Sequence, residues 1–435
     1  MRSNGPRAAP ARSTGRSNSG HASNIDAVNA ARLTERVARE SYGRLLAQLA
    51  ARTRDVAAAE DALSEAFAAA LKSWPHTGAP DNPEGWLFAA AKRKLIDAAR
   101  RAETARAGEA ELKRAAEEVE AEMAERALPD RRLGLLFACA HPEIDPAART
   151  PLMLQTVLGL SAERIAAAFM IEPAAMSQRL VRAKKRIAEA KIPFDVPPPE
   201  EWPERLGAVL QAIYAAYAEG WTDACGEDAE RRALAEGALW LARIATAQTN
   251  DPEAAALVAL ILMLEARRPA RRDAAGAYAP LDEQDVRLWR RDLVEEAVRI
   301  MARLAPHAEE AGRFQIEAGI QHAHLARYFA LPVNWGLIES LYIQLAAIVD
   351  SPAVKLNAVA ARARRAAPEE ALAALDALVA AEIALKSYQP YWALRADLLS
   401  RMERTEAARA AYDEAIARES DGAVRRFLLA RKARL

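Results

Sequence analysis

The chain has 435 residues, 51% of them hydrophobic and 28% charged, and its 60 basic and 60 acidic residues give a formal net charge of zero at pH 7. This composition predicts a soluble globular protein of several domains. It excludes a chain that is attracted to nucleic acid by its overall charge, so any such binding must come from local basic faces. No stretch approaches about 18 consecutive apolar residues, and no apolar signal core is present, so we expect no membrane contact and a cytoplasmic location.

Residue usage predicts an all-α fold. Ala, Leu, Glu and Arg are abundant, glycine is scarce, and runs of alternating β-branched residues are absent. The two cysteines, Cys139 and Cys225, lie in alanine-rich helical contexts, which favours buried reduced thiols. Since no zinc-ligand spacing accompanies them, we expect neither a metal nor a cofactor.

Composition and helical patterning divide the chain into six predicted segments. The sharpest boundary is "KIPFDVPPPEEWP", whose five prolines are incompatible with a helix. The segments are a disordered tail (1–26), a compact helical domain (27–101), an acidic linker (102–129), a second helical domain (130–191), a proline-rich linker (192–202) and a helical array (203–435).

An acidic pair marks the first helical domain. The stretch "DVAAAEDALSEAFAAALKSW" has one apolar face and carries Asp61 and Glu65 one turn apart on another face. Carboxylates at this spacing repel each other slightly unless a basic partner neutralises them. The arginines of a partner protein would serve, and a solvated acidic face is the alternative interpretation.

The next helix carries a tryptophan and several cations. In "NPEGWLFAAAKRKLIDAARR", Asn82 is the expected cap and Pro83 the first helical residue. Trp86, Arg93 and Arg100 then share one face. An aromatic ring combined with cations suits single-stranded nucleic acid through stacking and phosphate contacts. A half-buried packing role for Trp86 is an equal alternative.

Residues 161–187, "SAERIAAAFMIEPAAMSQRLVRAKKRI", predict two short helices joined by a tight turn, with Ser161 capping the first and Pro173 opening the second. The predicted buried stripe of the second helix is Met176, Leu180, Ala183 and Ile187. The opposite face holds Gln178, Arg182 and Lys185. Flanking positions hold Ser177, Arg179, Lys184 and Arg186. The spacing allows a helix-turn-helix that reads a major groove, and a solvated basic face is the alternative.

The C-terminal array ends in a pattern typical of one tetratricopeptide repeat. In "YWALRADLLSRMERTEAARAAYDEAIARES" the matching positions are Trp392, Ala396, Leu399, Ala408, Tyr412 and Ala415. Residues 354–380 are a looser copy. Because such arrays usually bind protein segments, we expect a possible protein partner on the array.

The order of these pieces resembles that of extracytoplasmic-function sigma factors of bacterial RNA polymerase. Residues 82–101 resemble the end of sigma domain 2, and residues 130–187 closely resemble sigma domain 4. The stretches "AVLQAIYAAYAEGW", "LMLEARRPAR" and "LDEQDVRLWRRDLV" resemble the subgroup with a large tetratricopeptide-like C-terminal extension. The resemblance extends over about residues 27–435 and carries the functional prediction.

The resemblance implies a protein that binds core RNA polymerase at its clamp helices and flap, recognises promoter DNA and assists melting without bond chemistry. Asp61 and Glu65 would dock on the clamp helices, and the loop 75–82 would receive a base flipped from the minus-ten element. The residues facing that strand would be Trp86, Lys92, Arg93 and Arg100. The residues reading the minus-thirty-five element would be Ser177, Gln178, Arg179, Arg182 and Lys185.

The chain departs from the family pattern at two places. Arg93 stands where members commonly have asparagine, which bears on base choice. Glu172 and Pro173 stand in the reverse of the usual order, which shifts the expected start of the recognition helix by a residue.

Two other classes of protein compete with this interpretation. A helix-turn-helix repressor or activator with a ligand- or peptide-sensing repeat domain would dimerise on a palindrome, but it leaves the acidic helix and Trp86 without a role. An enzyme in the array is the second. His322 and His324 are its only close histidine pair and do not share a helical face. No nucleophile–base arrangement or glycine-rich phosphate loop is present, so we expect no enzymatic activity.

Overall fold

The computed structural model describes residues 19–103, 130–169, 171–221, 229–273, 275–305 and 310–435. Within these ranges the chain is all-α, and its only β-type pairing is an isolated bridge between Arg272 and Tyr278. Contacts divide it into an N-terminal unit, Met1–Pro197, and a C-terminal unit, Pro198–Leu435. The division falls inside the proline-rich segment. No described helix is long and apolar enough to cross a membrane.

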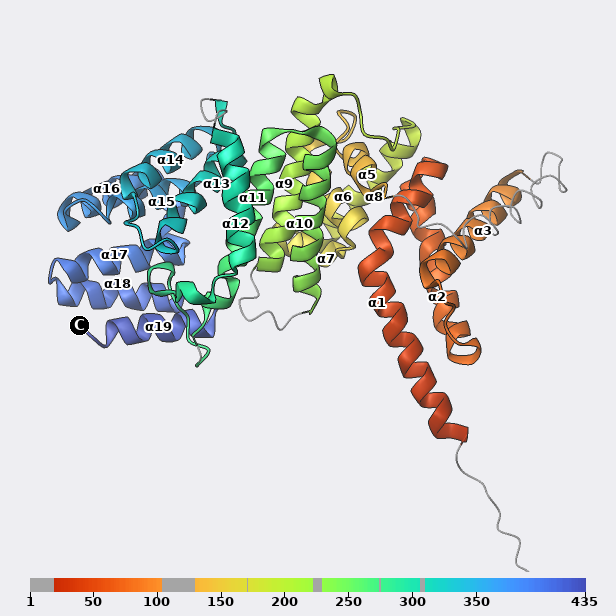
Figure 1. Ribbon diagram of the computed structural model, residues 1–435, viewed down its shortest axis with the longest axis horizontal. Helices are drawn as coiled ribbons and strands as arrows, with labels where there is room; N and C mark the ends of the chain where they lie inside the picture. Colours follow the sequence, from red (N-terminus) through yellow and green to blue (C-terminus); the bar gives the residue numbers. More distant parts are fainter. Residues whose placement is uncertain (1–18, 104–129, 170, 222–228, 274, 306–309) are drawn as a thin grey trace, which may run out of the picture. The chain divides into compact units, whose positions relative to one another are not determined.

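Among the described residues of the N-terminal unit, three long helices come first and four shorter ones follow (Figure 1). The long helices are α1 (Ser19–Thr53), α2 (Val56–Thr77) and α3 (Pro83–Glu103). The shorter ones are α5 (Arg132–Cys139), α6 (Pro146–Leu158), α7 (Ala162–Ala168) and α8 (Pro173–Glu189). Residues 1–18 of the predicted tail and 104–129 of the predicted acidic linker lie outside the described ranges.

Two predicted boundaries in this unit were wrong. The helix α1 starts at Ser19, inside the segment expected to be a tail, because no proline between residues 11 and 74 interrupts it. The helix α2 continues through Pro75 to Thr77, so the loop before α3 is Gly78–Asn82 rather than 75–82. Gly78, with a φ of 78°, ends α2 in a conformation that favours glycine.

The predicted helix starts of α3, α7 and α8 are confirmed. Asn82 Oδ1 accepts from the Gly85 amide at 2.9 Å, and Ser161 Oγ accepts from the Arg164 amide at 3.3 Å. Pro173 is the first residue of α8. Each group satisfies or removes one of the amides that a helix start leaves unpaired.

The helices α1 and α2 pack directly on later helices of the same unit. Helix α1 contacts α5 and α6, and α2 contacts α8. At the closest approach, a Cβ added to Gly43 of α1 would lie 1.9 Å from the Val157 carbonyl oxygen of α6. No side chain can be accommodated at that distance, so glycine at this position lets the two helices meet.

Cys139 is a buried free thiol, as predicted, and its Sγ lies 3.6 Å from Thr156 Oγ1. Burial raises its pKa to about 12, so the group stays protonated and unreactive at neutral pH. Cys225 lies outside the described residues.

The C-terminal unit is an array of helices, several of them paired side by side (Figure 1). Its first helices are α9 (Trp202–Trp221), α10 (Ala229–Thr249), α11 (Pro252–Arg267), α12 (Arg291–Leu304) and α13 (Arg313–His324). Next come α14 (Trp335–Ile348), α15 (Pro352–Arg362) and α16 (Pro368–Ala381). The last are α17 (Gln389–Arg401), α18 (Thr405–Ala417) and α19 (Gly422–Lys432). Short 3-10 turns interrupt the connection between α11 and α12 at Arg268–Arg271, Leu281–Glu283 and Val286–Leu288.

The segment with the tetratricopeptide-like pattern forms the paired helices α17 and α18. The pattern positions that are buried between them and their neighbours are Ala396, Leu399, Ala408, Tyr412 and Ala415. Trp392 is only half-buried, and its indole nitrogen donates to the Lys386 carbonyl oxygen at 2.8 Å.

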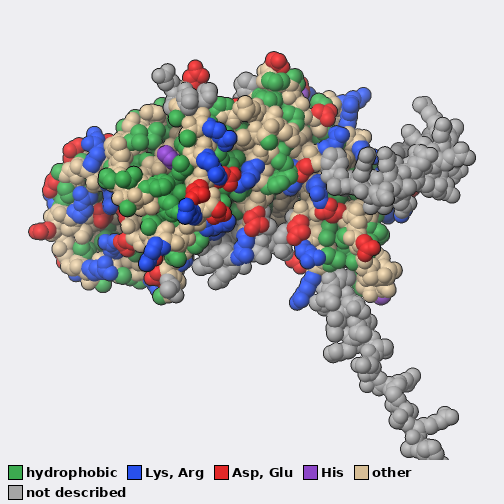
Figure 2. Space-filling view, in the orientation of Figure 1, with side chains coloured by type: hydrophobic (Ala, Val, Ile, Leu, Met, Phe, Trp, Pro, Cys, Tyr) green, Lys and Arg blue, Asp and Glu red, His purple; other side chains and the backbone are tan. Residues whose placement is uncertain are grey.

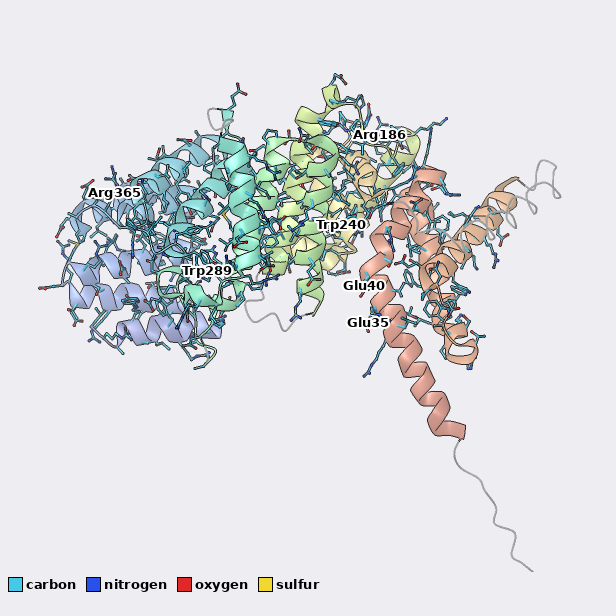
Figure 3. The ribbon with its side chains drawn as sticks, in the orientation of Figure 1. Glu35, Glu40, Arg186, Trp240, Trp289 and Arg365 are labelled. Atoms are coloured by element: carbon cyan, nitrogen blue, oxygen red, sulfur yellow. The ribbon has the colours of Figure 1, made fainter. Side chains whose placement is uncertain are left out.

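Ion pairs reinforce the packing of α14 against the residues around the end of α15. Glu339 of α14 is buried, and its carboxylate pairs with Arg362 at 3.2 Å and with Arg365, labelled in Figure 3, at 2.7 Å. On the face shown in Figure 2, basic and acidic side chains are interspersed, in keeping with the zero net charge.

Candidate nucleic-acid and polymerase interfaces

The predicted recognition helix α8 separates an apolar face from a polar one. Its buried residues are Met176, Leu180, Ala183 and Ile187, which confirms the predicted stripe. Gln178, Arg182 and Lys185 are exposed, while Ser177 and Arg179 are half-buried. Because the apolar stripe anchors the helix, the polar face is fixed in orientation toward solvent.

The cations on this exposed face have few internal partners. Lys185 reaches Glu189 of the same helix at 3.6 Å, a pair exposed enough to contribute little. Arg179 Nη1 donates a long 3.4 Å bond to the Ala147 carbonyl oxygen. Arg182 forms no ion pair within the described residues. A phosphate or a base edge could therefore engage these groups without first breaking a strong contact.

Lys184 and Arg186, predicted to flank the DNA-reading face, each pair with a carboxylate of the same unit. Lys184 Nζ lies 2.6 Å from Glu60 Oε2 of α2, and both side chains are mostly buried. Arg186, in the last turn of α8 (Figure 3), pairs with Glu143. Helical spacing places a residue on a face but does not show which neighbouring element packs there.

In the Glu60–Lys184 pair, the attraction of Lys184 does not fully offset the effect of burial on the Glu60 carboxylate. Burial raises the pKa of Glu60, although Lys184 acts to lower it. One carboxylate oxygen, Oε1, is buried without a hydrogen-bond partner. Glu60 also raises the pKa of Tyr42, for which burial is the larger cause. The contact between α2 and α8 thus includes a mostly buried ion pair, in which one carboxylate oxygen has neither solvent contact nor a hydrogen-bond partner.

The α3 residues predicted to face a melted strand have mixed environments. Trp86 is half-buried and meets Trp74 of α2 edge-on, with ring centroids 5.5 Å apart. This contact supports the packing role that the sequence left open, while part of the ring stays accessible. Arg93 is exposed and Lys92 half-buried, and the side chain of Arg100 lies outside the described set.

The helix α3 is fastened to α1 at its first turn. Glu84 accepts hydrogen bonds from Ser41 and Arg44, both on α1. Below them, Leu87 and Phe88 are fully buried. These contacts set the direction in which α3 presents Arg93.

The predicted polymerase-docking carboxylates, Asp61 and Glu65, lie exposed on α2. Glu65 Oε2 is 2.8 Å from Lys94 Nζ of α3, and both side chains are about half-exposed, so the pair is weak. A partner's arginine could displace Lys94 at small cost. Asp61 is adjacent to Glu60, so this acidic surface and the α2–α8 contact share one helix.

The neighbouring histidines His322 and His324 both lie on α13. His324 is buried, contacts Arg327 Nη1 through Nδ1 at 2.8 Å and meets Trp335 edge-on. No group of three potential metal ligands occurs among the described residues.

Sequence reasoning missed an arginine cluster in the C-terminal unit. Arg267, Arg268, Arg271 and Arg272 follow one another at the end of α11 and the following turn. The motif "LMLEARRPAR" contains most of them, but its spacing alone does not reveal which arginines have carboxylate partners.

Comparison with known proteins finds two matching family models. Residues 38–104, which run from α1 through α3, match the model of sigma-70 region 2. Residues 205–305, which run from α9 through α12, match DUF6596, a family of unknown function. No solved structure matches the chain.

A relative in Rhizobium meliloti (strain 1021), the uncharacterized protein R00370, is 38% identical over 371 residues, which cover 84% of this chain and 86% of that protein. Similarity at this level therefore extends over most of both chains. The chain belongs to the same family as this Rhizobium protein, and its region 2 supports a sigma-70 family factor with a role in transcription initiation.

Proposed function

We propose that the protein is a sigma factor of the extracytoplasmic-function type that docks on the clamp helices and flap of core RNA polymerase, recognises minus-ten and minus-thirty-five promoter elements and promotes melting. The observation that carries this proposal is the match of residues 38–104 to sigma-70 region 2. The protein does no bond chemistry in this role and acts in the cytoplasm. The C-terminal unit would regulate or assemble the initiation complex and receive a protein partner.

The helix α8 has the form required to read the minus-thirty-five element. It spans Pro173–Glu189 and exposes Gln178 and Arg182 on a face backed by buried Leu180. A major groove admits one α-helix, in which Arg pairs with guanine and Gln with adenine. Lys185, Ser177 and the half-buried Arg179 would contact phosphates or neighbouring base edges.

The helix α3 would face the minus-ten strand. Arg93 is exposed, Lys92 is half-buried, and Trp86 presents the part of its ring that Trp74 does not cover. Cations next to an accessible aromatic ring suit an unstacked strand. The loop Gly78–Asn82, shorter than predicted, would receive the flipped base.

Engagement of both elements requires the α2–α8 contact to open. The elements are named for positions roughly 25 base pairs apart, which corresponds to about 85 Å along B-form DNA at about 3.4 Å per pair. In the free protein, Lys184 of α8 lies 2.6 Å from Glu60 of α2. We therefore propose that docking of Asp61 and Glu65 on polymerase accompanies separation of α8 from α2.

A repressor or activator that binds a palindrome is the competing candidate. It would use α8 but would give the α1–α3 region no task. Polymerase dependence separates the two: the sigma factor requires core polymerase for promoter-specific binding, whereas the conventional regulator does not.

The test is in vitro transcription with purified protein, bacterial core polymerase and a library of promoter fragments. We expect promoter-specific transcripts from the wild type and at least a tenfold loss with Arg182→Ala, the size expected for one good base contact. Asp61→Ala/Glu65→Ala should lose transcription together with binding to core polymerase. Arg287→Ala, which removes an exposed cation from the C-terminal unit, is the matched control and should behave as wild type.

Polymerase-independent binding to a palindrome, with no transcript under any condition, would replace the sigma function with that of a conventional regulator.

A further inference from the structure

The four arginines at the end of α11 differ in how their charge is balanced. Arg268 pairs with Glu265 at 2.6 Å, and Arg272 pairs with Asp421 at 2.6 Å. Arg267 and Arg271 have no carboxylate partner among the described residues. No carboxylate among the described residues therefore balances the charge of these two guanidinium groups.

Arg267 is the more enclosed of these two groups. Its Nε is buried and has no hydrogen-bond partner, although the side chain as a whole keeps some solvent contact. Burial lowers its pKa to about 10, so it remains a cation at neutral pH. The ionisable groups that act on it most strongly are Arg271 and the phenols of Tyr217, Tyr342 and Tyr278, none of which is an anion at that pH.

Arg271 adds a second cation to the same place. Its guanidinium lies 4.3 Å from the centroid of the Trp221 ring, and its Nη1 donates to the Trp221 carbonyl oxygen at 2.9 Å. Burial and then the charge of Arg268 lower its pKa. The ring and the carbonyl orient the group but do not neutralise it.

The partial negative charge at the C-terminus of α11 is too small to balance the positive charge of Arg267. A helix C-terminus carries only a partial negative charge that acts within its last turn. Burying a guanidinium without a counter-ion costs much more than that attraction returns, and a neighbouring cation of the same sign adds to the cost. Buried guanidinium groups without a counter-ion are typical of anion-binding sites. A carboxylate or phosphate can accept two hydrogen bonds from the planar N–H donors of one guanidinium.

Neutral tyrosine hydroxyls act electrostatically on the two cations: those of Tyr217 and Tyr278 on both, and that of Tyr342 on Arg267. The Tyr217 hydroxyl already donates to Glu265 at 2.9 Å, which leaves the hydroxyls of Tyr278 and Tyr342 for a ligand. Burial raises the pKa of both tyrosines, so each hydroxyl keeps its proton. The groups come from α9, α11, α14 and the connection after α11, so they converge from separate parts of the unit.

We propose that Arg267 and Arg271 bind the carboxylate or phosphate group of a small-molecule ligand, with Tyr278 and Tyr342 as additional hydrogen-bond donors. This site lies within the C-terminal unit and does not depend on the sigma function. If both proposals hold, the ligand is an effector that stabilises one state of the extension.

The experiment measures thermal unfolding of the full-length protein in sodium phosphate and in sodium succinate, against sodium chloride at the same ionic strength. At concentrations well above the dissociation constant, we expect a bound anion to raise the midpoint by roughly 2–4 °C or more. A response to phosphate alone identifies a phosphate ligand, and a response to succinate alone identifies a carboxylate ligand.

Arg267→Met is the main variant. It should unfold at or above the wild-type midpoint in chloride, because it removes a buried unpaired charge, and should bind the effective anion at least tenfold more weakly by titration calorimetry. Arg271→Gln provides a second test with a smaller change in the interior. Arg287→Gln removes the same charge from an exposed position and should respond to anions as wild type does.

The proposal is overturned if neither anion stabilises the wild type, or if Arg267→Met and Arg271→Gln respond as strongly as the wild type. Neutralisation by the chain's own carboxylates would give the first of these results. Transcription is not part of the readout, so failure here leaves the proposed sigma function untouched.

Discussion

The helix α8 and the segment 267–272 are both rich in cations, but the cations differ in their exposure to solvent. On α8, Gln178, Arg182 and Lys185 stand on an exposed face. In the second region Arg267 is largely buried near tyrosine phenols, with no carboxylate partner in the described part of the chain. Exposed cations suit an extended polyanion whose binding weakens with salt, whereas enclosed cations suit a small anion that replaces water.

The difference comes from what lies beneath each segment. The apolar stripe of α8 is buried against its own unit, so the opposite face must remain in water. The arginines of segment 267–272 begin at the last residue of α11, a helix that is buried almost all round.

Removing the anchor of α8 should have the largest effect. Leu180 is 1% exposed and its neighbour Val181 is 62% exposed. Leu180→Ala should lower the free energy of unfolding by about 2–5 kcal/mol through lost burial and a cavity, and Val181→Ala by less than about 0.5 kcal/mol. Denaturant unfolding followed by circular dichroism measures both. Equal effects would mean that α8 is not held by this stripe.

Acid should destabilise the enclosed region through His324. Burial, followed by the charges of Arg327 and Arg267, lowers its pKa from 6.5 to about 3, against a smaller opposing effect of Asp282. As the pH falls below 6.5, the histidine is therefore protonated in the unfolded chain but stays neutral in the folded protein. The stability contribution is intact above pH 6.5 and is lost as pH falls toward 3, by about 2–3 kcal/mol between pH 7.5 and 4.5.

His324→Gln should reduce this pH dependence, because glutamine can still accept from Arg327 but does not titrate. Urea unfolding at pH 7.5 and 4.5, compared between wild type and variant, isolates the histidine from other titrating groups. An identical loss of stability in both proteins would show that His324 is not shielded from protons.

Removing the buried charge of Lys184 should lower the free energy of unfolding more than removing the exposed charge of Lys185. Lys184→Met leaves Glu60 without its cation and should cost about 1–3 kcal/mol at pH 8, since the carboxylate is mostly buried. The raised pKa of Glu60 means that the cost should shrink as pH falls and the group takes up a proton. Lys185→Met, at an exposed position, should cost less than about 1 kcal/mol.

A double variant, Glu60→Gln/Lys184→Met, completes the cycle. Coupling between the two sites should appear as a smaller loss than the sum of the single changes. Additive effects would show that the charges do not interact across the α2–α8 contact.

The smallest effect is expected on the acidic surface of α2. Asp61→Asn/Glu65→Gln breaks the exposed pair with Lys94 and should change stability by less than about 1 kcal/mol, because both positions are exposed. Thermal unfolding checks this directly. A large loss would mean that these carboxylates hold the fold together, and their effect on transcription could not then be attributed to polymerase docking.

Local features of the helices followed from the sequence. The cap Asn82, the opening Pro173 and the buried stripe from Met176 to Ile187 all depend on residues within a turn or two of each other, and all are confirmed. The two faces of α8 and the all-α fold were predictable for the same reason. Capping hydrogen bonds and the 3.6-residue period of a helix depend only on residues close together in the sequence, so the sequence alone predicts them.

Only the tertiary structure decided which cations are used and which are available. Lys184 and Lys185 are adjacent in sequence, but the first meets Glu60, 124 residues away, and the second stays in water. Arg267 and Arg268 are likewise neighbours, and only Arg268 has a carboxylate partner among the described residues. Burial and pairing of charge depend on helices distant in sequence, so no local pattern contains them.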